Sequence, residues 1–296
     1  MVFRHYSQFG VLVLLWRTYR LLAMDVPDFP LAIYGNVYQG ACVIHDQSEL
    51  ENKRQIALGN SLQEAARVEE KELLGWIRAL VHARRDLGSK PIQEWSLSDL
   101  DGVNAQINYF VRPTTSSVRR RSDDIFWFVQ PITEGEESVF KLSERDFNRC
   151  SHEPWIQRIV NSLQSKMHFF PPADSIEQRM STLFAHLKKS EQQQHDPLTS
   201  AATLHTGIIS IHPFEHGNKR TARIVSNLYL MRHHMGALCY NDNMCFRDEE
   251  LIDPYLDALC IDLQQGTSEN LRCYMSDKLK EQHIGVPNLE RQSPQE

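Results

Sequence analysis

The chain lacks the features that mark several large classes of protein. Its 296 residues include six cysteines, none of them in a Cys-x-x-Cys pair, which excludes a zinc ribbon and a dense disulfide framework. The formal net charge of −6 gives no electrostatic drive toward nucleic acid. We therefore expect a cytoplasmic protein with reduced thiols, no nucleic-acid partner and no firm membrane association.

Residues 1–24 are the ambiguous stretch of the chain. Residues 11–16 read Val-Leu-Val-Leu-Leu-Trp, with Arg4 before them and Arg17 after them. This apolar run is too short to cross a bilayer, and no small-residue cleavage site follows it convincingly. We treat residues 1–24 as an uncertain N-terminal extension. A packing helix, a weak targeting element and a secreted effector protein all stay open.

Helical patterns dominate the rest of the chain. Hydrophobic residues make up 41% and charged residues 24% of the sequence, which is ordinary for a globular protein with ample core. Apolar residues recur at helical spacing, and Pro and Gly separate the segments. Helices are predicted over residues 49–85, 96–110, 154–166, 175–189, 197–211, 219–235 and, near the end, around 255–259 and 271–275. The expected fold class is mainly α.

Strand-like composition is confined to residues 112–139. Residues 125–129 read Ile-Phe-Trp-Phe-Val, and we expect them to form a hairpin that turns near Gly135. The only basic cluster, residues 119–121, is followed by Asp123 and Asp124. That alternation of charge predicts a solvated surface turn.

Residues 212–223 concentrate the chemistry of the chain. They read His-Pro-Phe-Glu-His-Gly-Asn-Lys-Arg-Thr-Ala-Arg, and the apolar residues after them continue at helical spacing, so a loop leads into a helix here. The unpaired N–H groups of such a helix start bind anions. Arg220 and Arg223 lie three residues apart and share a helix face, where both can grip phosphate. With His212 as proton acceptor beside this anion site, the segment is suited to nucleotidyl or phosphoryl transfer.

The dodecapeptide resembles the signature of the Fic family, H-P-F-x-(D/E)-G-N-(G/K)-R-x-x-R. The resemblance implies a helical core with a short β-hairpin flap, ATP with Mg²⁺ or Mn²⁺, and transfer of AMP to a Ser, Thr or Tyr hydroxyl of a target protein. His212 is then the catalytic base, and Phe214 anchors the loop in the core. The implied ATP-binding and phosphate-binding residues are Gly217, Asn218, Lys219, Arg220 and Arg223.

Two positions depart from the usual family pattern. His216 stands where the acidic residue that carries Mg²⁺ is expected, and neutral imidazole suits softer metals. Lys219 replaces the commoner Gly and adds a point charge for a phosphate. His216 and its neighbour Glu215 are therefore the candidate metal ligands. Two alternatives to AMP transfer stay open: a catalytically weakened Fic-like protein that binds nucleotide or a partner, and a Doc-like protein kinase.

The same residues also match H-x-x-E-H, the inverted zinc-protease motif, through His212, Glu215 and His216. That chemistry requires both histidines on one face of a regular helix. Pro213 and Gly217 disfavour a helix interior at this place. We therefore expect a loop here and rank zinc chemistry below nucleotidyl transfer.

Residues 167–174 resemble the Fic flap, the hairpin that aligns a target's backbone beside the catalytic histidine. They read Met-His-Phe-Phe-Pro-Pro-Ala-Asp, and prolines after aromatic residues favour an extended segment that can pair with a peptide. The resemblance makes Phe169, Phe170 and Pro171 the target-binding flap, with a plain inter-helix loop as the alternative. His205, in the helix before the signature, resembles a packing histidine of the family.

Many Fic proteins carry an inhibitory helix, (S/T)-x-x-x-E-(G/N), whose Glu pairs with the last Arg of the signature and blocks ATP. Residues 58–62 read Leu-Gly-Asn-Ser-Leu and place Leu58 at the Glu position. Leucine cannot pair with a guanidinium, so inhibition by this element is not expected. A second register, over Glu51 and Asn52, lacks the hydroxyl residue at its start.

The predicted organisation has four parts. Residues 1–24 are the uncertain extension, and residues 25–90 form an N-terminal helical region with a degenerate inhibitory helix. Residues 91–280 form the Fic core, and residues 281–296 form a flexible tail. The sequence indicates neither the target protein nor the oligomeric state.

Overall fold

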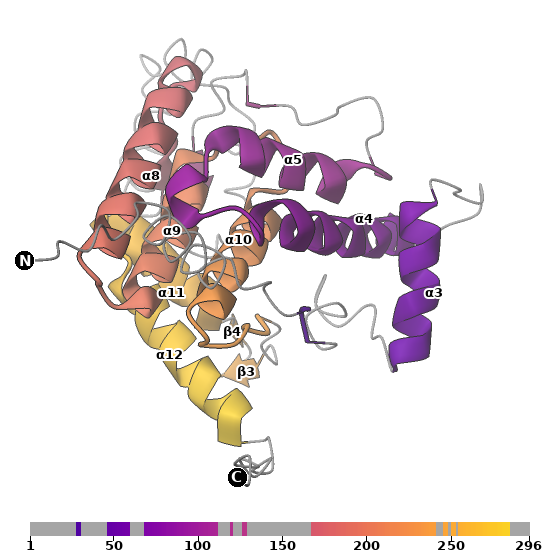
Figure 1. The fold of residues 1–296 in the computed structure, drawn as a ribbon. Coiled ribbons are helices and arrows are strands. Elements are labelled where there is room, and N and C mark those ends of the chain that lie inside the picture. The colour runs from indigo at the N-terminus through magenta and orange to yellow at the C-terminus, as the bar shows by residue number, and fades with distance from the viewer. Residues whose placement is uncertain are drawn as a thin grey trace, which may run out of the picture.

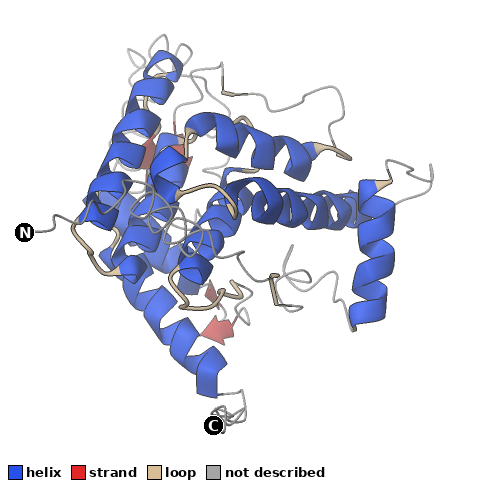
Figure 2. Ribbon diagram, in the orientation of Figure 1, coloured by secondary structure: helices blue, strands red, loops and turns tan. Residues whose placement is uncertain are grey.

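A computed structural model gives the fold of the chain (Figure 1). It describes residues 28–30, 46–59, 68–111, 119–120, 126–128, 167–240, 245–247, 250–252 and 254–284. Helices dominate these residues, with two short strand pairs (Figure 2). The predicted fold class, mainly α, is confirmed.

The helices fall into two runs along the chain. The first run comprises α3 (Gln47–Leu58), α4 (Val68–His82), a π-helical turn (Ala83–Leu87), a 3₁₀ turn (Ile92–Glu94) and α5 (Leu97–Asn108). The second comprises a 3₁₀ turn (Ala173–Ser175), α8 (Ile176–Gln192), α9 (Pro197–Ile211), α10 (Asn218–Arg232), α11 (Pro254–Gln265) and α12 (Glu269–Ile284).

Helices α9 and α10 lie side by side at the centre (Figure 1). Helices α8, α11 and α12 pack on α9, whereas α5 packs on α10 and α4 packs on α5. The sequence of α9 explains its central place, because apolar residues such as Ala201, Ala202 and Leu204 lie on different sides of it and are fully buried. One hydrophobic core includes side chains from both runs of helices.

Side-chain caps define where several of these helices begin. Asp196 accepts hydrogen bonds from the backbone N–H groups of Leu198 and Thr199, and Pro197 occupies the first turn of α9. Ser96 begins α5, where the Asp99 carboxylate accepts from its backbone N–H at 2.8 Å. The predicted start of this helix near Ser96 is confirmed.

The first strand pair joins the predicted strand to the predicted flap. Strand β1 (Phe126–Phe128) pairs antiparallel with β2 (Met167–Phe169), in the register Phe126 to Phe169. The predicted hairpin turn near Gly135 lies outside the described residues and stays a prediction. Strands β3 (Cys245–Arg247) and β4 (Glu250–Ile252) form a second pair that the sequence did not indicate. Three residues are too few to show an alternating pattern.

The predicted bounds of two segments change. The helical stretch 49–85 is divided, because α3 ends at Leu58 before Gly59 and α4 begins at Val68. Helix α12 continues to Ile284, so residues 281–284 belong to the last helix and not to the tail. The predictions for residues 1–24, 154–166 and 285–296 lie outside the described residues. The domain boundary near residue 90 stays a prediction.

Two global properties complete the fold. Within the described ranges, no helix is both long and apolar enough to cross a membrane. Among the described residues, Cys239, Cys260 and Cys273 form no disulfide.

Candidate active site

The signature residues form the loop between α9 and α10, as predicted. His212 has a left-handed backbone (φ 52°), and its N–H donates to the Ile208 carbonyl at 3.0 Å, which ends α9. Gly217 (φ 81°) precedes the first residue of α10. Since His212 leaves the helix and Glu215 and His216 lie in the loop, the H-x-x-E-H helix required by the zinc-protease motif does not form.

Phe214 and Asn218 hold the loop in shape. Phe214 is fully buried in the core, which confirms its predicted anchoring role. The Asn218 side chain accepts from the Phe214 N–H at 3.0 Å and donates to the Phe214 carbonyl at 2.6 Å. The amide of Asn218 is thus occupied within the loop, so it shapes the anion site through the backbone.

Two asparagines of α5 support the loop from behind. Asn104 Nδ2 donates to the His216 carbonyl at 2.8 Å and to Thr221 Oγ1 at 3.1 Å. A Cβ atom at position 217 would lie 3.0 Å from that same amide nitrogen, so glycine suits both the left-handed backbone and the tight contact. Asn108 donates to Asn104 in turn. Asn104 and Asn108, four residues apart in an apolar helix face, were the signal that sequence reasoning missed.

Arg120 corrects the prediction of a solvated turn at residues 119–121. Its side chain is only 3% exposed. Nε donates to the His212 carbonyl at 3.0 Å, the backbone N–H donates to the Pro213 carbonyl at 2.8 Å, and Nη2 donates to the Pro171 carbonyl. The carbonyls at the end of α9 lack helical partners, and a guanidinium supplies the donors they need. The acidic residues after it in sequence concealed this role.

The imidazole of His212 lies against the flap. It stacks on the ring of Phe170, with centroids 4.0 Å apart and an interplanar angle of 22°. Burial, and then the charge of Arg120, lowers the pKa of His212 to about 3. The imidazole is therefore neutral at physiological pH and can accept a proton.

The three cations of the signature have different surroundings. Lys219 is exposed. Arg220 forms an ion pair with Glu72 of α4, with Nη2 and Oε1 3.4 Å apart. Arg223 lies over the rings of Tyr255 and Tyr240, and no carboxylate of the described residues pairs with it. The phosphate-binding role predicted for these residues stays a prediction, and Arg223 is the cation best placed for it.

The candidate metal ligands lie at the surface of the loop. His216 is exposed and Glu215 is partly buried. Among the residues that the structure describes, no group of three or more His, Cys, Asp or Glu side chains could hold a metal. Such a cage is not required for a metal that travels with a nucleotide, since Mg²⁺ takes one or two protein ligands beside phosphate oxygens and water. One side chain at position 215 or 216 fits that arrangement.

The predicted flap residues include two that face the catalytic loop. Phe170 is buried against His212, and the Pro171 carbonyl accepts from Arg120. Phe169 ends β2, and His168 beside it lies 3.2 Å from the Ser210 carbonyl through Nε2. The flap is therefore joined to the signature loop through stacking and hydrogen bonds. Its role in binding a target stays a prediction.

Leu58 and His205 lie apart from the loop. Leu58 is the last residue of α3 and 49% exposed. It contributes no carboxylate, and the expectation that this segment does not inhibit stays a prediction. His205 is fully buried and contacts Tyr255 and Ser226 through its two ring nitrogens, so its predicted packing role is confirmed.

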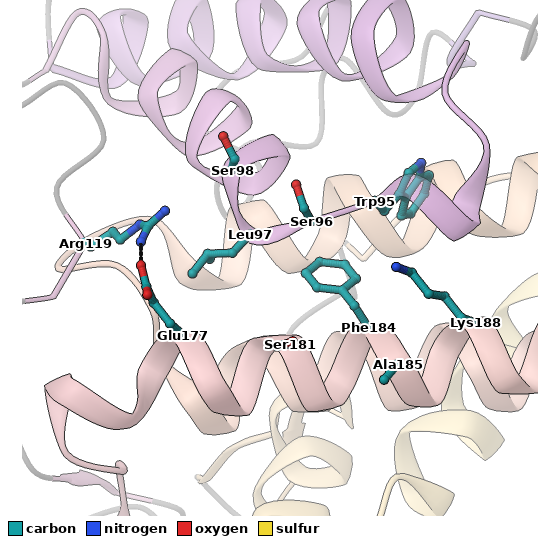
Figure 3. Close-up of a pocket in the computed structure, with 10 residues that line it drawn as sticks. All are labelled: Trp95, Ser96, Leu97, Ser98, Arg119, Glu177, Ser181, Phe184, Ala185 and Lys188. Carbon is teal, nitrogen blue, oxygen red and sulfur yellow. Dashed lines mark hydrogen bonds and ion pairs between the residues drawn. The ribbon is translucent and has the colours of Figure 1, made fainter.

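Two cavities lie outside the signature loop. One, of about 330 Å³, lies between the start of α5 and α8, where Arg119 pairs with Glu177 and where Leu97 and Phe184 are among the lining residues (Figure 3). The other, of about 280 Å³, is lined by residues of α9 and α11 together with His168. No residue of the dodecapeptide lines either of them.

Comparisons with known proteins agree with this site. Residues 131–230, which include the flap and the signature, match the Fic/DOC family. A fragment of Fic-1 from C. elegans has a similar fold, with a TM-score of 0.52 and 17% identity, over 95% of this chain and 67% of that one. A Fic domain containing signaling protein from Bacteroides thetaiotaomicron has a TM-score of 0.51 and 15% identity, over 90% and 86% of the two chains.

One relative is known by its activity. The chain is 36% identical over 69 residues to a uridine 5'-monophosphate transferase of Xanthomonas campestris pv. campestris, strain 8004. That match spans 22% of this chain and only 13% of the relative. Part of the chain therefore matches the Fic/DOC family, the fold is that of Fic-domain proteins, and a short segment is similar to a uridine 5'-monophosphate transferase.

Proposed function

We propose that the chain is a protein adenylyltransferase, which transfers AMP from ATP to a Ser, Thr or Tyr hydroxyl of a target protein. The observation that carries this proposal is the position of His212. Its neutral imidazole lies at the end of α9, in the same short loop that leads into the start of α10. A base and an anion site are thus joined by a few residues that the core holds rigidly.

The proposed reaction assigns a separate task to each group. Nδ1 of His212 is buried, so Nε2 is the nitrogen that takes the proton of the target hydroxyl. The hydroxyl oxygen forms a bond to the α-phosphorus of ATP, and the bond from that phosphorus to the β-phosphate oxygen breaks. Pyrophosphate leaves, and the N–H groups at the start of α10 together with Arg223 stabilise its charge.

The lowered pKa of His212 is compatible with this role. A pKa of about 3 describes the site without an anion. Bound phosphate brings negative charge close to the imidazole and offsets the field of Arg120, which raises the pKa toward the range of an effective base. Mg²⁺ or Mn²⁺ on the phosphates, with Glu215 or His216 as protein ligand, would supply further neutralisation of charge.

The flap suggests how a target protein binds. β2 pairs with β1 along one edge, and no other described strand pairs with it. An extended segment of a target could add to the remaining edge and so bring its hydroxyl to His212, which already stacks on Phe170 of the flap. We place this enzyme in the cytoplasm, because its six cysteines include no Cys-x-x-Cys pair and are typical of reduced thiols.

UMP transfer is the second candidate, since the relative from Xanthomonas campestris is a uridine 5'-monophosphate transferase. Both reactions use the same phosphate chemistry and differ only in the base of the nucleotide. Neither of the two cavities described above is lined by residues of the signature loop, so these cavities do not distinguish the two bases.

Transfer from labelled nucleotide tests the proposal. The protein is incubated with cell lysate, Mg²⁺ or Mn²⁺ and ATP or UTP labelled at the α-phosphate, and modified proteins are identified by mass. We expect an adenylyl gain that His212→Ala abolishes. A uridylyl gain supports the second candidate, and a phosphate gain from γ-labelled ATP supports a Doc-like kinase. Nucleotide binding without any transfer would identify a weakened Fic-like binding protein.

A further inference from the structure

Arg223 lies between two buried tyrosines. Its guanidinium carbon is 4.6 Å from the centre of the Tyr255 ring and 5.3 Å from that of Tyr240. The two rings meet edge to face, with centroids 5.3 Å apart at 70°. Tyr255 is 0% exposed and Tyr240 is 4% exposed. Both distances lie within the range of a cation–π interaction, which is stronger when the groups are desolvated.

A closed hydrogen-bond network fixes both rings. His205 lies 2.9 Å from the Tyr255 hydroxyl through Nε2 and 3.1 Å from Ser226 Oγ through Nδ1. Ser226 Oγ is also 3.0 Å from the Tyr240 hydroxyl and donates to the Ala222 carbonyl at 2.7 Å. The donor of Ser226 is therefore used within α10.

The positions of the other protons follow from the hydrogen bond that Ser226 Oγ donates to the Ala222 carbonyl. The Ser226 oxygen accepts from Tyr240 and from the N–H of His205, whose Nε2 is then free of hydrogen and accepts from Tyr255. Burial, with the charge of Arg223 adding to it, lowers the pKa of His205 well below its usual value, which keeps this tautomer neutral. Both phenols thus donate their protons, and this increases the electron density of the rings that face the guanidinium.

The network leaves the charge of Arg223 available. A carboxylate partner would neutralise the guanidinium, whereas an aromatic face orients it and leaves its hydrogen-bond donors in place. Within the described part of the chain, no carboxylate pairs with Arg223, and its buried Nε has no hydrogen-bond partner. A buried donor of this kind is costly unless a ligand satisfies it. The arrangement is suited to a polyanion.

We propose that Tyr240 and Tyr255 form an aromatic seat that positions Arg223 for the phosphates of a nucleoside triphosphate, and that His205 holds this seat. The proposal rests on the proposed function for the identity of the ligand. It adds three positioning residues, which lie outside residues 212–223 and come from α9, α11 and the segment after α10. Because the rings already restrict the Arg223 side chain, it loses less conformational entropy when the nucleotide binds.

Paired variants of the full chain test the seat. The dissociation constants of ATP and UTP are measured by titration calorimetry, and the melting temperature of each variant is recorded. Tyr255→Leu removes the aromatic face, and we expect about tenfold weaker binding. Tyr255→Phe keeps the face but leaves Nε2 of His205 without its partner, so it should melt at a lower temperature and keep the affinity within about threefold.

Tyr274 offers a matched control. It is also a buried tyrosine, and its ring packs on Tyr255 with centroids 5.9 Å apart. Tyr274→Leu should lower the melting temperature and leave nucleotide affinity unchanged. In the Tyr255→Leu background, Arg223→Ala should weaken nucleotide binding by much less than in the wild type. The two side chains contribute to binding through the same interaction, so once one is removed the other contributes little. Tyr240→Leu serves the same purpose if Tyr255→Leu does not fold.

The outcomes are distinct. Equal losses of affinity in Tyr255→Leu and Tyr274→Leu, or the same loss in Tyr255→Phe as in Tyr255→Leu, would overturn the aromatic seat. Full affinity in Tyr255→Leu and Tyr240→Leu would overturn it as well. Binding that depends on Arg223 and on both rings, but without group transfer, would support the seat and contradict the proposed enzymatic function. A wild-type chain that binds neither ATP nor UTP would overturn both.

Discussion

Arg120 and His212 are joined through the backbone: Nε of Arg120 donates to the His212 carbonyl at 3.0 Å. The same guanidinium donates to the Pro171 carbonyl, so one buried side chain connects the catalytic loop to the flap. These donors satisfy carbonyls at the end of α9 that would otherwise be unpaired in the core. The relative position of His212 and the flap therefore depends on Arg120.

Replacement of Arg120 should impair both stability and transfer. Arg120→Gln removes charge-assisted hydrogen bonds to buried carbonyls, each contributing roughly 1.5–3 kcal/mol. We expect the free energy of unfolding to fall by about 3 kcal/mol, and transfer at saturating nucleotide to fall at least about 100-fold, since a small misplacement of His212 is enough for that. Denaturant unfolding and the transfer assay measure the two effects.

The neighbouring residue Arg119 provides the control. Its side chain pairs with Asp101 at 2.7 Å and is 37% exposed, and its contact with Phe214 is made by the backbone. Arg119→Gln should therefore keep transfer within about threefold. If Arg120→Gln were as active as Arg119→Gln, the hydrogen bonds to the loop would have no part in positioning His212.

The ion pair between Glu72 and Arg220 predicts that removing the Glu72 carboxylate increases the affinity for ATP. Helix α4 brings the carboxylate to Arg220, which the signature assigns to phosphate, and both side chains are largely buried. The pair competes with a phosphate for the same guanidinium. Glu72→Gln should therefore tighten ATP binding by about three- to tenfold, as calorimetric titration would show.

A second acidic residue of α4 controls for the change of net charge. Among the described residues Glu70 forms no ion pair, and Glu70→Gln should alter ATP affinity by less than about twofold. If Glu70→Gln and Glu72→Gln changed ATP affinity equally, the cause would be the change of net charge and not the loss of the ion pair with Arg220. A loss of affinity in Glu72→Gln would mean that the carboxylate positions Arg220 for the phosphate.

The parts of this site that the sequence predicts are local ones. Pro213 and Gly217 interrupt the helical pattern around the loop, and the apolar residues after Lys219 repeat with helical spacing. Both signals act over a few residues, so the loop and the start of α10 were predicted correctly. The capping residue Ser96 belongs to the same class of signal, whereas the burial of Phe214 was implied by the resemblance to the Fic family.

The parts that the sequence misses depend on residues far apart in the chain. Arg120 contacts His212 across 92 positions, and β1 pairs with a strand about 40 positions later. A run of charges next to aspartates looks the same whether it faces solvent or the core. Strand pairing likewise depends on which edge is available in three dimensions. Glu72 and the tyrosines beside Arg223 carry no local pattern at all.

The metal preference of the loop is the next prediction. His216 is exposed and occupies the place of the expected acidic ligand, and imidazole accepts Mn²⁺ more readily than Mg²⁺. We expect Mn²⁺ to support transfer better than Mg²⁺ in the native chain. His216→Asp should raise the rate with Mg²⁺ about tenfold by restoring an oxygen ligand, and rates measured with each metal test this.

His186 supplies the control for an added carboxylate, because it is exposed on α8. His186→Asp should leave the rates with both metals unchanged. If His216→Asp is no faster than the parent with Mg²⁺, another group holds the ion, and Glu215→Gln is the variant to measure next.

The buried histidines predict a loss of stability in mild acid. Burial lowers the pKa of His205 well below 6.5 and that of His212 to about 3, and the pKa values of His82 and His168 are lowered as well. At these four histidines the unfolded chain takes up protons near pH 6.5, whereas the folded chain takes them up only at lower pH. The folded state therefore loses stability as the pH falls from about 6.5 toward 3, by about 1.4 kcal/mol per pH unit for each histidine that stays neutral.

Unfolding in denaturant at pH 7.0, 6.0 and 5.0 measures this slope, at values above those where most carboxylates begin to titrate. His212→Asn removes one such proton, so the slope between pH 6 and 5 should decrease by roughly 1 kcal/mol per pH unit. A slope that His212→Asn leaves unaltered would mean that folding does not lower the pKa of this imidazole, and burial and Arg120 would then not control its protonation.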